Sequence, residues 1–276
     1  MDYNQVDVPE VISNWEKWWD GELDRPLFFV TCTKEYQRKI PLKSKYVNAH
    51  YSFDMSAEYI IDAETCKLVE MDYFADAFPL FWPNFGPGVE AALVGGTAEL
   101  TEETVWFGPG KFKDMDISNI AFELDTDNAW FKRMMQIHDA AGKIWGKQVI
   151  QGLTDLGGGI DVLSSFRPGE RLLFDLYDHP KDVKRLSCNL NELWFECFEH
   201  FNKVIKKNSP GYSCWAGILS SGTNYMLQCD FAYMISPEMF EEFVKPDIEY
   251  ACKKLDRSFY HLDGVGQLAH IQHLCS

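Results

Sequence analysis

The sequence predicts an α/β protein organised as a parallel (β/α) barrel. The chain has 276 residues, of which 46% are hydrophobic and 25% charged, enough to bury one sizeable core. After Lys143, strand-like segments alternate with long helix-like segments, which indicates βαβ units. A single domain of about 250 residues is typical of an eight-stranded barrel. We therefore favour a barrel over a doubly wound sheet, which the same alternation also permits, and treat residues 1–276 as one domain.

The chain begins with an amphipathic segment and a short apolar run. Residues 8–20 carry valine, isoleucine and tryptophan at helical spacing, which predicts a helix packed by its tryptophans, and Gly21 ends it. The run LFFVTC at residues 27–32 predicts a fully buried strand. No apolar stretch has the length or flanks of a membrane span or a signal peptide. Eight scattered cysteines suit reduced thiols, so we expect a cytoplasmic protein.

Residues 34–106 differ in amino-acid composition from the rest of the chain. They are rich in aromatic residues, proline and glycine. This composition predicts an aromatic-rich excursion from the regular fold, a long loop region that contains one short helix at residues 89–93. Ordered loops of this size commonly carry function. Asp76, Trp82 and Phe85 are therefore candidate substrate-binding residues.

The second half of the chain supplies the alternating elements. They are a strand in KQVIQGLTD that ends at Asp155, helices at 167–177 and 181–207, a strand in CWAGILSSG, a helix that begins at SPE (236–238), a strand in SFYHLD and a helix in LAHIQHLC. Serine, proline and an acidic residue in that order are typical of a helix N-terminus.

In a barrel, the residues for chemistry lie where the strands end and the following loops begin. Asp155 follows one strand. His261 and Asp263 are two residues apart at the end of another, so their side chains point to the same face. Such a pair can perform acid–base chemistry or hold a divalent metal. The alternative is a buried histidine that bonds a neighbouring aspartate and only orders the barrel mouth.

Charge and motif spacing argue against two classes of ligand. The chain has 26 basic and 42 acidic residues, a net charge of −16, which disfavours nucleic acid and anionic membrane surfaces. GVGQLA at residues 264–269 imitates a dinucleotide fingerprint, but that fingerprint requires an acidic residue about 20 positions later, which is absent from this sequence. We expect no nucleotide cofactor.

Several segments together resemble the uroporphyrinogen decarboxylase-like (URO-D) superfamily, in the branch allied to corrinoid-dependent methyltransferases. They are WWDGELDRPLFFV, DAFPLFWPNFGPGVEAALVGG with TVWFGP, LGGGIDVLSSFRPGERLLFDLYDHPKDVKRL, and DFAYMISPEMFEEFVKPDIEYACKKLDRSFYHLDGVGQLAHIQHL. The resemblance covers nearly the whole chain, and SPEMFEEFVKP and HLDG are its most specific parts. It implies a (β/α)8 barrel. Counted against that pattern, the chain lacks the last two strands and their helices.

The resemblance implies two activities, and this sequence departs from both patterns. Porphyrinogen decarboxylases grip substrate carboxylates with an Arg-Gln-Ala-Gly-Arg segment. The matching stretch here, VTCTKEYQRKIP, has only Arg38, and the chain has seven arginines in all. The methyltransferases carry zinc on a His-x-Cys pair, which corresponds here to His261 and Asp263. The softer thiolate ligand is thus replaced by a harder carboxylate.

The function that we expect from this resemblance is methyl transfer that involves a small methylated compound or a corrinoid carried by a partner protein. His261 would be a metal ligand or acid–base group, Asp263 its companion, and Asp155 a second carboxylate. Zinc or another divalent metal is the candidate cofactor. The alternatives are a uroporphyrinogen-type carboxy-lyase and a non-catalytic truncated barrel.

Overall fold

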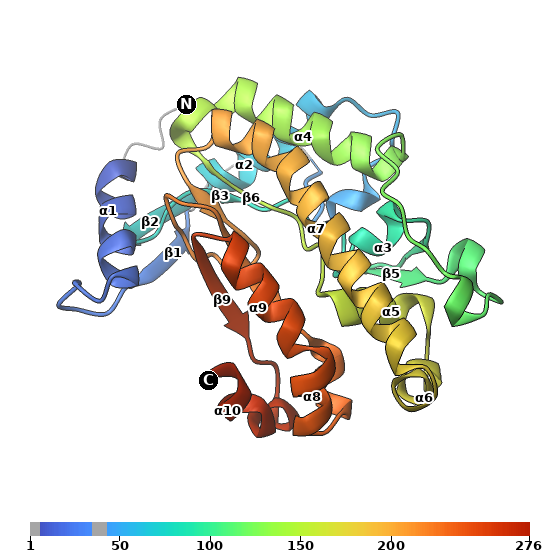
Figure 1. Cartoon of the computed structure of the whole chain (residues 1–276). Helices are drawn as coiled ribbons and strands as arrows, with labels where there is room; N and C mark the ends of the chain where they lie inside the picture. The colour runs from blue at the N-terminus through green and yellow to red at the C-terminus, as the bar shows by residue number, and fades with distance from the viewer. Residues whose placement is uncertain (1–5, 35–42) are drawn as a thin grey trace. The chain divides into compact units, whose positions relative to one another are not determined.

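A computed structural model describes residues 6–34 and 43–276 (Figure 1). Arg38 lies outside these residues. The chain divides into two compact units. Unit 1 comprises the described residues up to Asn84 together with Lys132–Thr154 and Phe201–Tyr225. Unit 2 comprises Phe85–Phe131, Asp155–His200 and Met226–Ser276.

Unit 1 contains a three-stranded parallel sheet. Its strands are β3 (Leu80–Phe81), β6 (Ile150–Gly152) and β7 (Tyr212–Ser213), in the order β3–β6–β7. Leu80 lies opposite Ile150 and Gln151 lies opposite Tyr212. Parallel neighbours require long crossover connections, and the chain supplies them with helices that include α4 (Ala129–Trp145) and α7 (Pro180–Asn208).

The helix expected over residues 8–20 forms as α1 (Val8–Trp19). The Asp7 carboxylate accepts the Glu10 backbone N–H at 3.1 Å, which caps the helix N-terminus. Val11 and Trp15 are buried in a cluster that also contains Phe78, Ile150 and Leu219. Trp15 therefore packs against the sheet region of unit 1, whereas Trp18 is exposed and Trp19 is half-buried.

The strand expected at residues 27–32 forms in a different setting. β1 (Phe29–Thr33) pairs antiparallel with β2 (Met71–Ala75) in a two-stranded ribbon. All five β1 residues are exposed, and Phe29 keeps 44% of its surface in solvent. The prediction of a fully buried strand is therefore wrong. A short apolar run favours a strand but does not determine which elements cover its two faces.

Residues 34–106 contain more regular structure than their composition predicts. They include α2 (Ala57–Val69), whose N-terminus is capped by the Ser56 hydroxyl that accepts the Tyr59 N–H at 3.2 Å. The expectation of a single short helix is wrong, because no proline or glycine interrupts the stretch after Ser56. The short helix itself forms as α3 (Glu90–Leu93), followed by the antiparallel pair β4 (Thr97–Leu100) and β5 (Val105–Gly108).

Unit 2 is mainly helical. It contains α5 (Gly159–Phe166), α6 (Arg171–Asp178), the Pro180–His200 part of α7, α8 (Pro237–Phe243), α9 (Lys245–Lys254) and α10 (Ile271–Leu274). Two strands, β8 (Asn224–Gln228) and β9 (Arg257–His261), are hydrogen-bonded to each other, and β9 runs beside α9 (Figure 1). Ser236 caps α8 by accepting the Met239 N–H at 3.3 Å, as the SPE pattern predicts.

The core of unit 2 is aromatic and carries one buried ion pair. The rings of Phe112, Phe122 and Phe166 contact one another with centroids 4.6–5.4 Å apart. Arg167 forms two hydrogen bonds to the Asp175 carboxylate at 2.5 and 2.7 Å, and both side chains are 6% exposed. This bidentate geometry offsets the desolvation of both charges.

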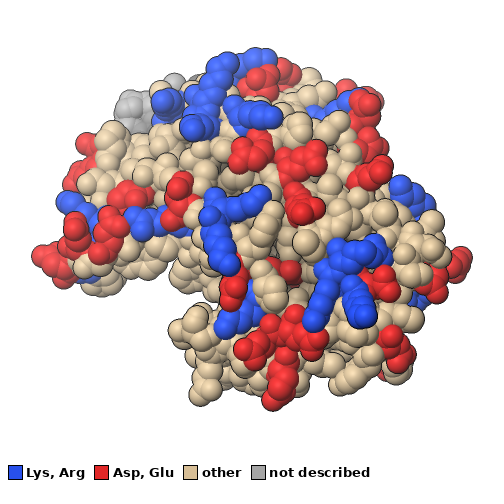
Figure 2. Space-filling model, viewed as in Figure 1, with Lys and Arg blue, Asp and Glu red and all other residues tan. Residues whose placement is uncertain are grey.

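The described strands form a mixed α/β fold and do not close into a barrel. β3 and β7 have two residues each, so the parallel sheet pairs over only a few positions. No helix in the described ranges is long and apolar enough to cross a membrane. On the face drawn in Figure 2, basic and acidic side chains are interspersed.

Candidate functional site

The six residues singled out in the sequence divide between the two units. Asp155, His261, Asp263 and Phe85 belong to unit 2, whereas Asp76 and Trp82 belong to unit 1. The unit 2 residues that follow strands lie within one acidic cluster, which we call the strand-end cluster. Its members are Asp155, Asp161, Gln228, Asp230, Tyr260, His261 and Asp263.

Asp155 lies three residues beyond β6 and is 7% exposed. The Gln228 side-chain amide donates to both carboxylate oxygens, at 3.1 and 3.3 Å, and the Gly157 N–H donates at 2.9 Å. The Asp155 backbone carbonyl accepts the Val89 N–H at 3.0 Å, next to the start of α3. Burial raises the pKa of the Asp155 carboxyl to about 6 despite these hydrogen bonds.

Asp161 is in the first turn of α5 and reaches the loop after β8. Its carboxylate accepts the backbone N–H groups of Asp230 and Phe231 at 3.0 and 2.9 Å. Burial, followed by the charges of Asp230 and Asp155, raises the pKa of Asp161 to about 7. The carboxyl therefore holds its proton in an appreciable fraction of molecules near neutral pH.

Asp230 connects the buried part of the cluster to its exposed part. It lies two residues beyond β8, and Asp263 lies two residues beyond β9. Burial and then the Asp263 charge raise the pKa of the Asp230 carboxyl, and His261 acts in the opposite direction. Asp230 and Asp263 are exposed, and His261 is half-buried. The structure thus brings His261 and Asp263 into electrostatic contact with the loop after β8.

Tyr260 lies on the other face of β9 from His261. Its hydroxyl donates to Gln267 Oε1 at 3.1 Å, and the Gln267 amide donates to the Cys229 carbonyl at 3.0 Å. Burial and the neighbouring Cys229 and Asp161 raise the pKa of the Tyr260 phenol far above its ordinary value. Tyr260 therefore stays neutral and fixes β9 to the loop that carries Asp230.

This arrangement suits proton transfer. Two adjacent carboxyl groups with pKa values of about 6 and about 7 can each donate a proton near neutral pH. Strongly perturbed carboxyls at strand ends are also a common mark of functional sites. The cluster contains no lysine or arginine, so its charge favours substrates that are neutral or cationic at the reacting group.

The metal expectation does not fit the described residues. A zinc site needs at least three protein ligands. Within residues 6–34 and 43–276, no group of three or more His, Cys, Asp or Glu side chains is arranged to hold a metal ion. A metal ion at His261 and Asp263 would therefore require a further ligand.

Asp76 has structural partners in unit 1. Arg25 forms a bidentate ion pair with its carboxylate at 2.6 and 2.8 Å, and the Phe28 N–H donates to it at 2.9 Å. The Asn14 amide donates at 3.2 Å, and the Trp15 indole N–H donates to the Asp76 carbonyl at 3.1 Å. The Arg25 guanidinium holds the pKa of Asp76 below its ordinary range. These contacts tie α1 to the segment before β3.

The two aromatic candidates differ in their surroundings. Phe85 is fully buried and contacts the edge of the Trp130 ring, with centroids 5.8 Å apart. Trp82 is half-buried, and its indole nitrogen has no hydrogen-bond partner among the described residues. A role in substrate binding stays a prediction for both residues.

Sequence reasoning missed Asp161, Gln228 and Asp230. Gln228 and Asp230 depend on β8, a strand that was not predicted. The segment NYMLQ has no period-2 alternation, and its apolar run of three residues is too short to distinguish a strand from a helix. Asp161 lies in α5, a helix that was not predicted because it begins at a run of glycines. An acidic residue in a first helical turn is a recognisable signal, but its contact with residue 230 is purely tertiary.

Three of the four described arginines of unit 2, Arg167, Arg171 and Arg185, have structural partners that are clear from their hydrogen bonds. Arg167 is held by Asp175, and Arg171 donates to the Lys113 carbonyl at 2.9 Å. Arg185 donates to a backbone carbonyl at 2.8 Å and to the Asp182 carboxylate at 3.0 Å. These bonds direct the three guanidinium groups to partners outside the strand-end cluster. A substrate with many carboxylates would need such forks in the site.

Comparison with known proteins identifies a similar fold. The sequence matches no protein-family model and no curated protein. The structure is similar to that of a methyltransferase from Methanosarcina mazei, with a TM-score of 0.61 and 11% sequence identity. The match covers 92% of this chain and 70% of that chain. At this identity the similarity shows the fold alone: the chain has a mixed α/β fold that also occurs in a methyltransferase.

Proposed function

We propose that the chain is a cytoplasmic member of the URO-D superfamily whose fold is related to the (β/α)8 barrel, and that it transfers a methyl group from a small methylated compound to a corrinoid carried by a partner protein. The fold shared with a methyltransferase supports this, together with the motifs that resemble the corrinoid-linked branch. The observation that carries the proposal is the Asp161 carboxyl of the strand-end cluster, whose pKa is raised to about 7 by burial and by the neighbouring charges of Asp230 and Asp155.

Demethylation of an ether oxygen or of a neutral amine nitrogen is assisted by an acid. When the bond between the methyl carbon and such a heteroatom breaks, its electron pair stays on the heteroatom, which gains a proton and leaves as a neutral alcohol or amine. Asp161 has a pKa of about 7 and can supply that proton at neutral pH. The methyl group passes to the nucleophilic acceptor, and Asp161 regains its proton from solvent.

The other cluster residues set the state of Asp161 and position the substrate. The negative charges of Asp155 and Asp230 favour the protonated form of Asp161. Gln228 holds Asp155 in place through its side-chain amide. His261 and Asp263, at the exposed end of the cluster, would orient the substrate's polar group or return protons from solvent.

A carboxy-lyase is the second candidate. It would use the same acid to protonate carbon after carbon dioxide leaves. The structural partners of Arg167, Arg171 and Arg185 argue against a substrate with many carboxylates. We therefore place methyl transfer first.

The test is a methyl-transfer assay with free reduced cobalamin as acceptor and a panel of O-methyl, N-methyl and S-methyl compounds as donors. Formation of methylcobalamin is followed by its absorbance. Asp161→Asn should lower the rate with the best donor by about 100-fold or more, because general acids contribute about 10²–10⁴ to rates. Asp178→Asn, at an exposed position at the end of α6, is the matched control and should leave the rate unchanged.

Two outcomes would contradict the proposal. One is an Asp161→Asn variant as fast as the unchanged protein. The other is carbon dioxide release from a carboxylated tetrapyrrole without methyl transfer from any donor. The separate metal hypothesis is tested by elemental analysis: a metal held by His261 and Asp263 must be lost in the His261→Ala variant.

A further inference from the structure

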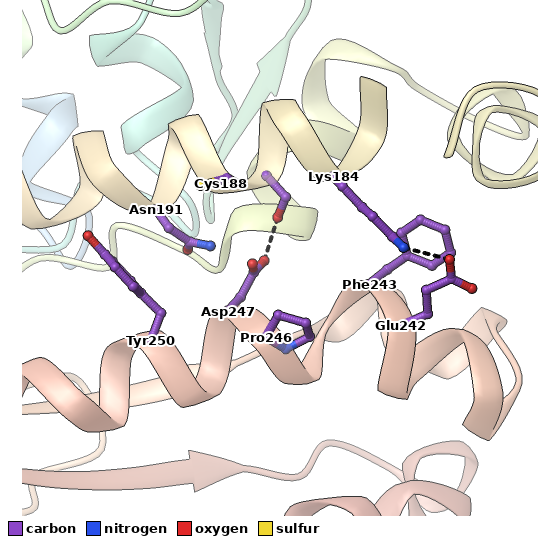
Figure 3. Close-up of a pocket in the computed structure, with 9 residues that line it drawn as sticks. Lys184, Cys188, Asn191, Glu242, Phe243, Pro246, Asp247 and Tyr250 are labelled. Atoms are coloured by element: carbon purple, nitrogen blue, oxygen red, sulfur yellow. Dashed lines mark hydrogen bonds and ion pairs between the residues drawn. The ribbon is translucent and has the colours of Figure 1, made fainter. Parts of the chain in front are cut away.

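Unit 2 contains a pocket that shares no residue with the strand-end cluster. It lies between α7 and the α8–α9 pair and has a volume of about 300 Å³ (Figure 3). Its lining residues are Lys184, Ser187, Cys188, Asn191, Glu242, Phe243, Pro246, Asp247 and Tyr250. This volume is at the small end of the range for ligand sites, so the pocket suits a small molecule.

The polar groups of the pocket gather around Asp247. In Figure 3 the carboxylate of Asp247 points from α9 toward α7, where the Ser187 hydroxyl donates to it. Asn191, one turn further along α7, also hydrogen-bonds to this carboxylate. Gly159 leaves room for the group, because a Cβ there would lie 2.9 Å from Asp247 Oδ2 and 3.0 Å from Ser187 Oγ. Asp247 is thus held by two residues of α7, in a space that the missing side chain of Gly159 leaves open.

Among residues 6–34 and 43–276, no basic side chain forms an ion pair with Asp247. Lys184 is the basic residue of the lining, and its ammonium pairs with Glu242 at 2.7 Å, with both side chains about half-exposed. Glu90, on α3, is fully buried, and burial followed by the Asp247 charge raises its pKa well above the ordinary value, so the negative charge of this region comes from Asp247. The pocket therefore favours positive charge beside Asp247.

The remaining walls are largely apolar. Phe243, Pro246 and Tyr250 extend from α8 and α9 along the opening (Figure 3). Aromatic rings also attract cations through their π-electron faces, as the Lys184 ammonium 5.3 Å from the Phe243 ring centre illustrates. A ligand with one cationic end and a short apolar body would match both halves of the pocket.

We propose that this pocket binds a small organic cation, an alkylammonium whose charged nitrogen pairs with Asp247 while its carbon chain lies against Phe243, Pro246 and Tyr250. The Asn191 carbonyl oxygen and the Ser187 oxygen are further acceptors for the ammonium hydrogens. This site is additional to the proposed methyl transfer and does not depend on it.

The affinity of the pocket for an organic cation should increase as the pH rises. Burial raises the pKa of Asp247 to about 7, whereas alkylammonium ions stay charged well above that value. A cation binds the carboxylate form, so affinity should rise about tenfold between pH 6 and pH 8. The other titratable or charged groups around Asp247 are Lys184 and Cys188 on α7, Glu242 on α8, Tyr250 on α9, Glu90 on α3, and Cys229.

The experiment is a calorimetric titration of the full chain at pH 8 with n-hexylammonium chloride, n-hexanol and sodium hexanoate, which share one apolar chain. We expect hexylammonium to bind at least tenfold more tightly than hexanol, and hexanoate to give no saturable binding. Asp247→Asn should remove this preference. Glu249→Gln, the matched change on the exposed side of α9, should preserve it.

Equal affinities for hexylammonium and hexanol in the unchanged protein would overturn the proposal, and so would hexylammonium binding that survives Asp247→Asn. The comparison of ligands uses the unchanged protein and so decides the question even if Asp247→Asn does not fold. Asn191→Leu, a second variant, should weaken hexylammonium binding and leave hexanol binding unchanged.

Discussion

The replacement of Asp161 by asparagine tests the electrostatics of the strand-end cluster through protein stability. The Asp161 pKa is about 7 in the folded chain against an ordinary value of 3.8. Between these values the folded state holds a proton that the unfolded chain has lost, so stability falls as pH rises through this window. The whole window corresponds to about 4 kcal/mol, and the part between pH 5 and pH 8 to about 3 kcal/mol.

Asparagine does not titrate, so the stability of the variant does not include the decrease with rising pH that Asp161 causes in the unchanged protein. The free energy of unfolding of Asp161→Asn, relative to the unchanged protein, should therefore increase by about 3 kcal/mol from pH 5 to pH 8. Urea unfolding followed by tryptophan fluorescence at both pH values measures this difference, and contributions common to both proteins cancel. Asp178→Asn, at the exposed end of α6, is measured beside it as the matched Asp-to-Asn change. A relative stability of Asp161→Asn that does not change with pH would refute the reasoning.

Two further changes test contacts within each unit. Arg25→Ala removes the ion pair of the buried Asp76 carboxylate, so the melting temperature at pH 7 should fall by several degrees. Because the Asp76 pKa is held low, this difference should shrink as the pH falls through that pKa; a constant difference would argue against the ion pair. Gly158→Ala places a Cβ 2.3 Å from the Gln228 carbonyl and should cost about 1–3 kcal/mol in urea unfolding. Unchanged stability would show that α5 and β8 are not closely packed there.

Local patterns in the sequence predicted the elements whose signals are local. The apolar and tryptophan positions of α1 and the Ser236 cap of α8 each involve residues a few positions apart in the chain. The same kind of signal existed for α2 in the Ser56 cap, but the proline-rich and glycine-rich neighbourhood obscured it. Composition over a long window is thus a weaker guide than a cap followed by an uninterrupted stretch.

Burial was harder to predict than secondary structure. The run at residues 27–32 forms β1, yet its side chains are exposed because its neighbour is only the β2 strand of the ribbon. The sheet of unit 1 likewise pairs over a few residues, so strand patterns overstate its extent. Which faces are covered depends on partners distant in the chain, and a short run carries no information about them.

The sequence by itself determined the α/β alternation, the acidic charge and the presence of carboxylates after strands at Asp155 and Asp263. Only the tertiary structure decided that Asp161, from the start of a helix, accepts N–H groups from the loop after β8, and that Asp247 meets Ser187 across two helices. Both carboxyls owe their raised pKa values chiefly to lost solvation, which depends on every segment packed around them. A residue's type and its neighbours in the chain do not specify that packing. The raised pKa values of buried carboxyls can therefore be recognised only in the folded structure.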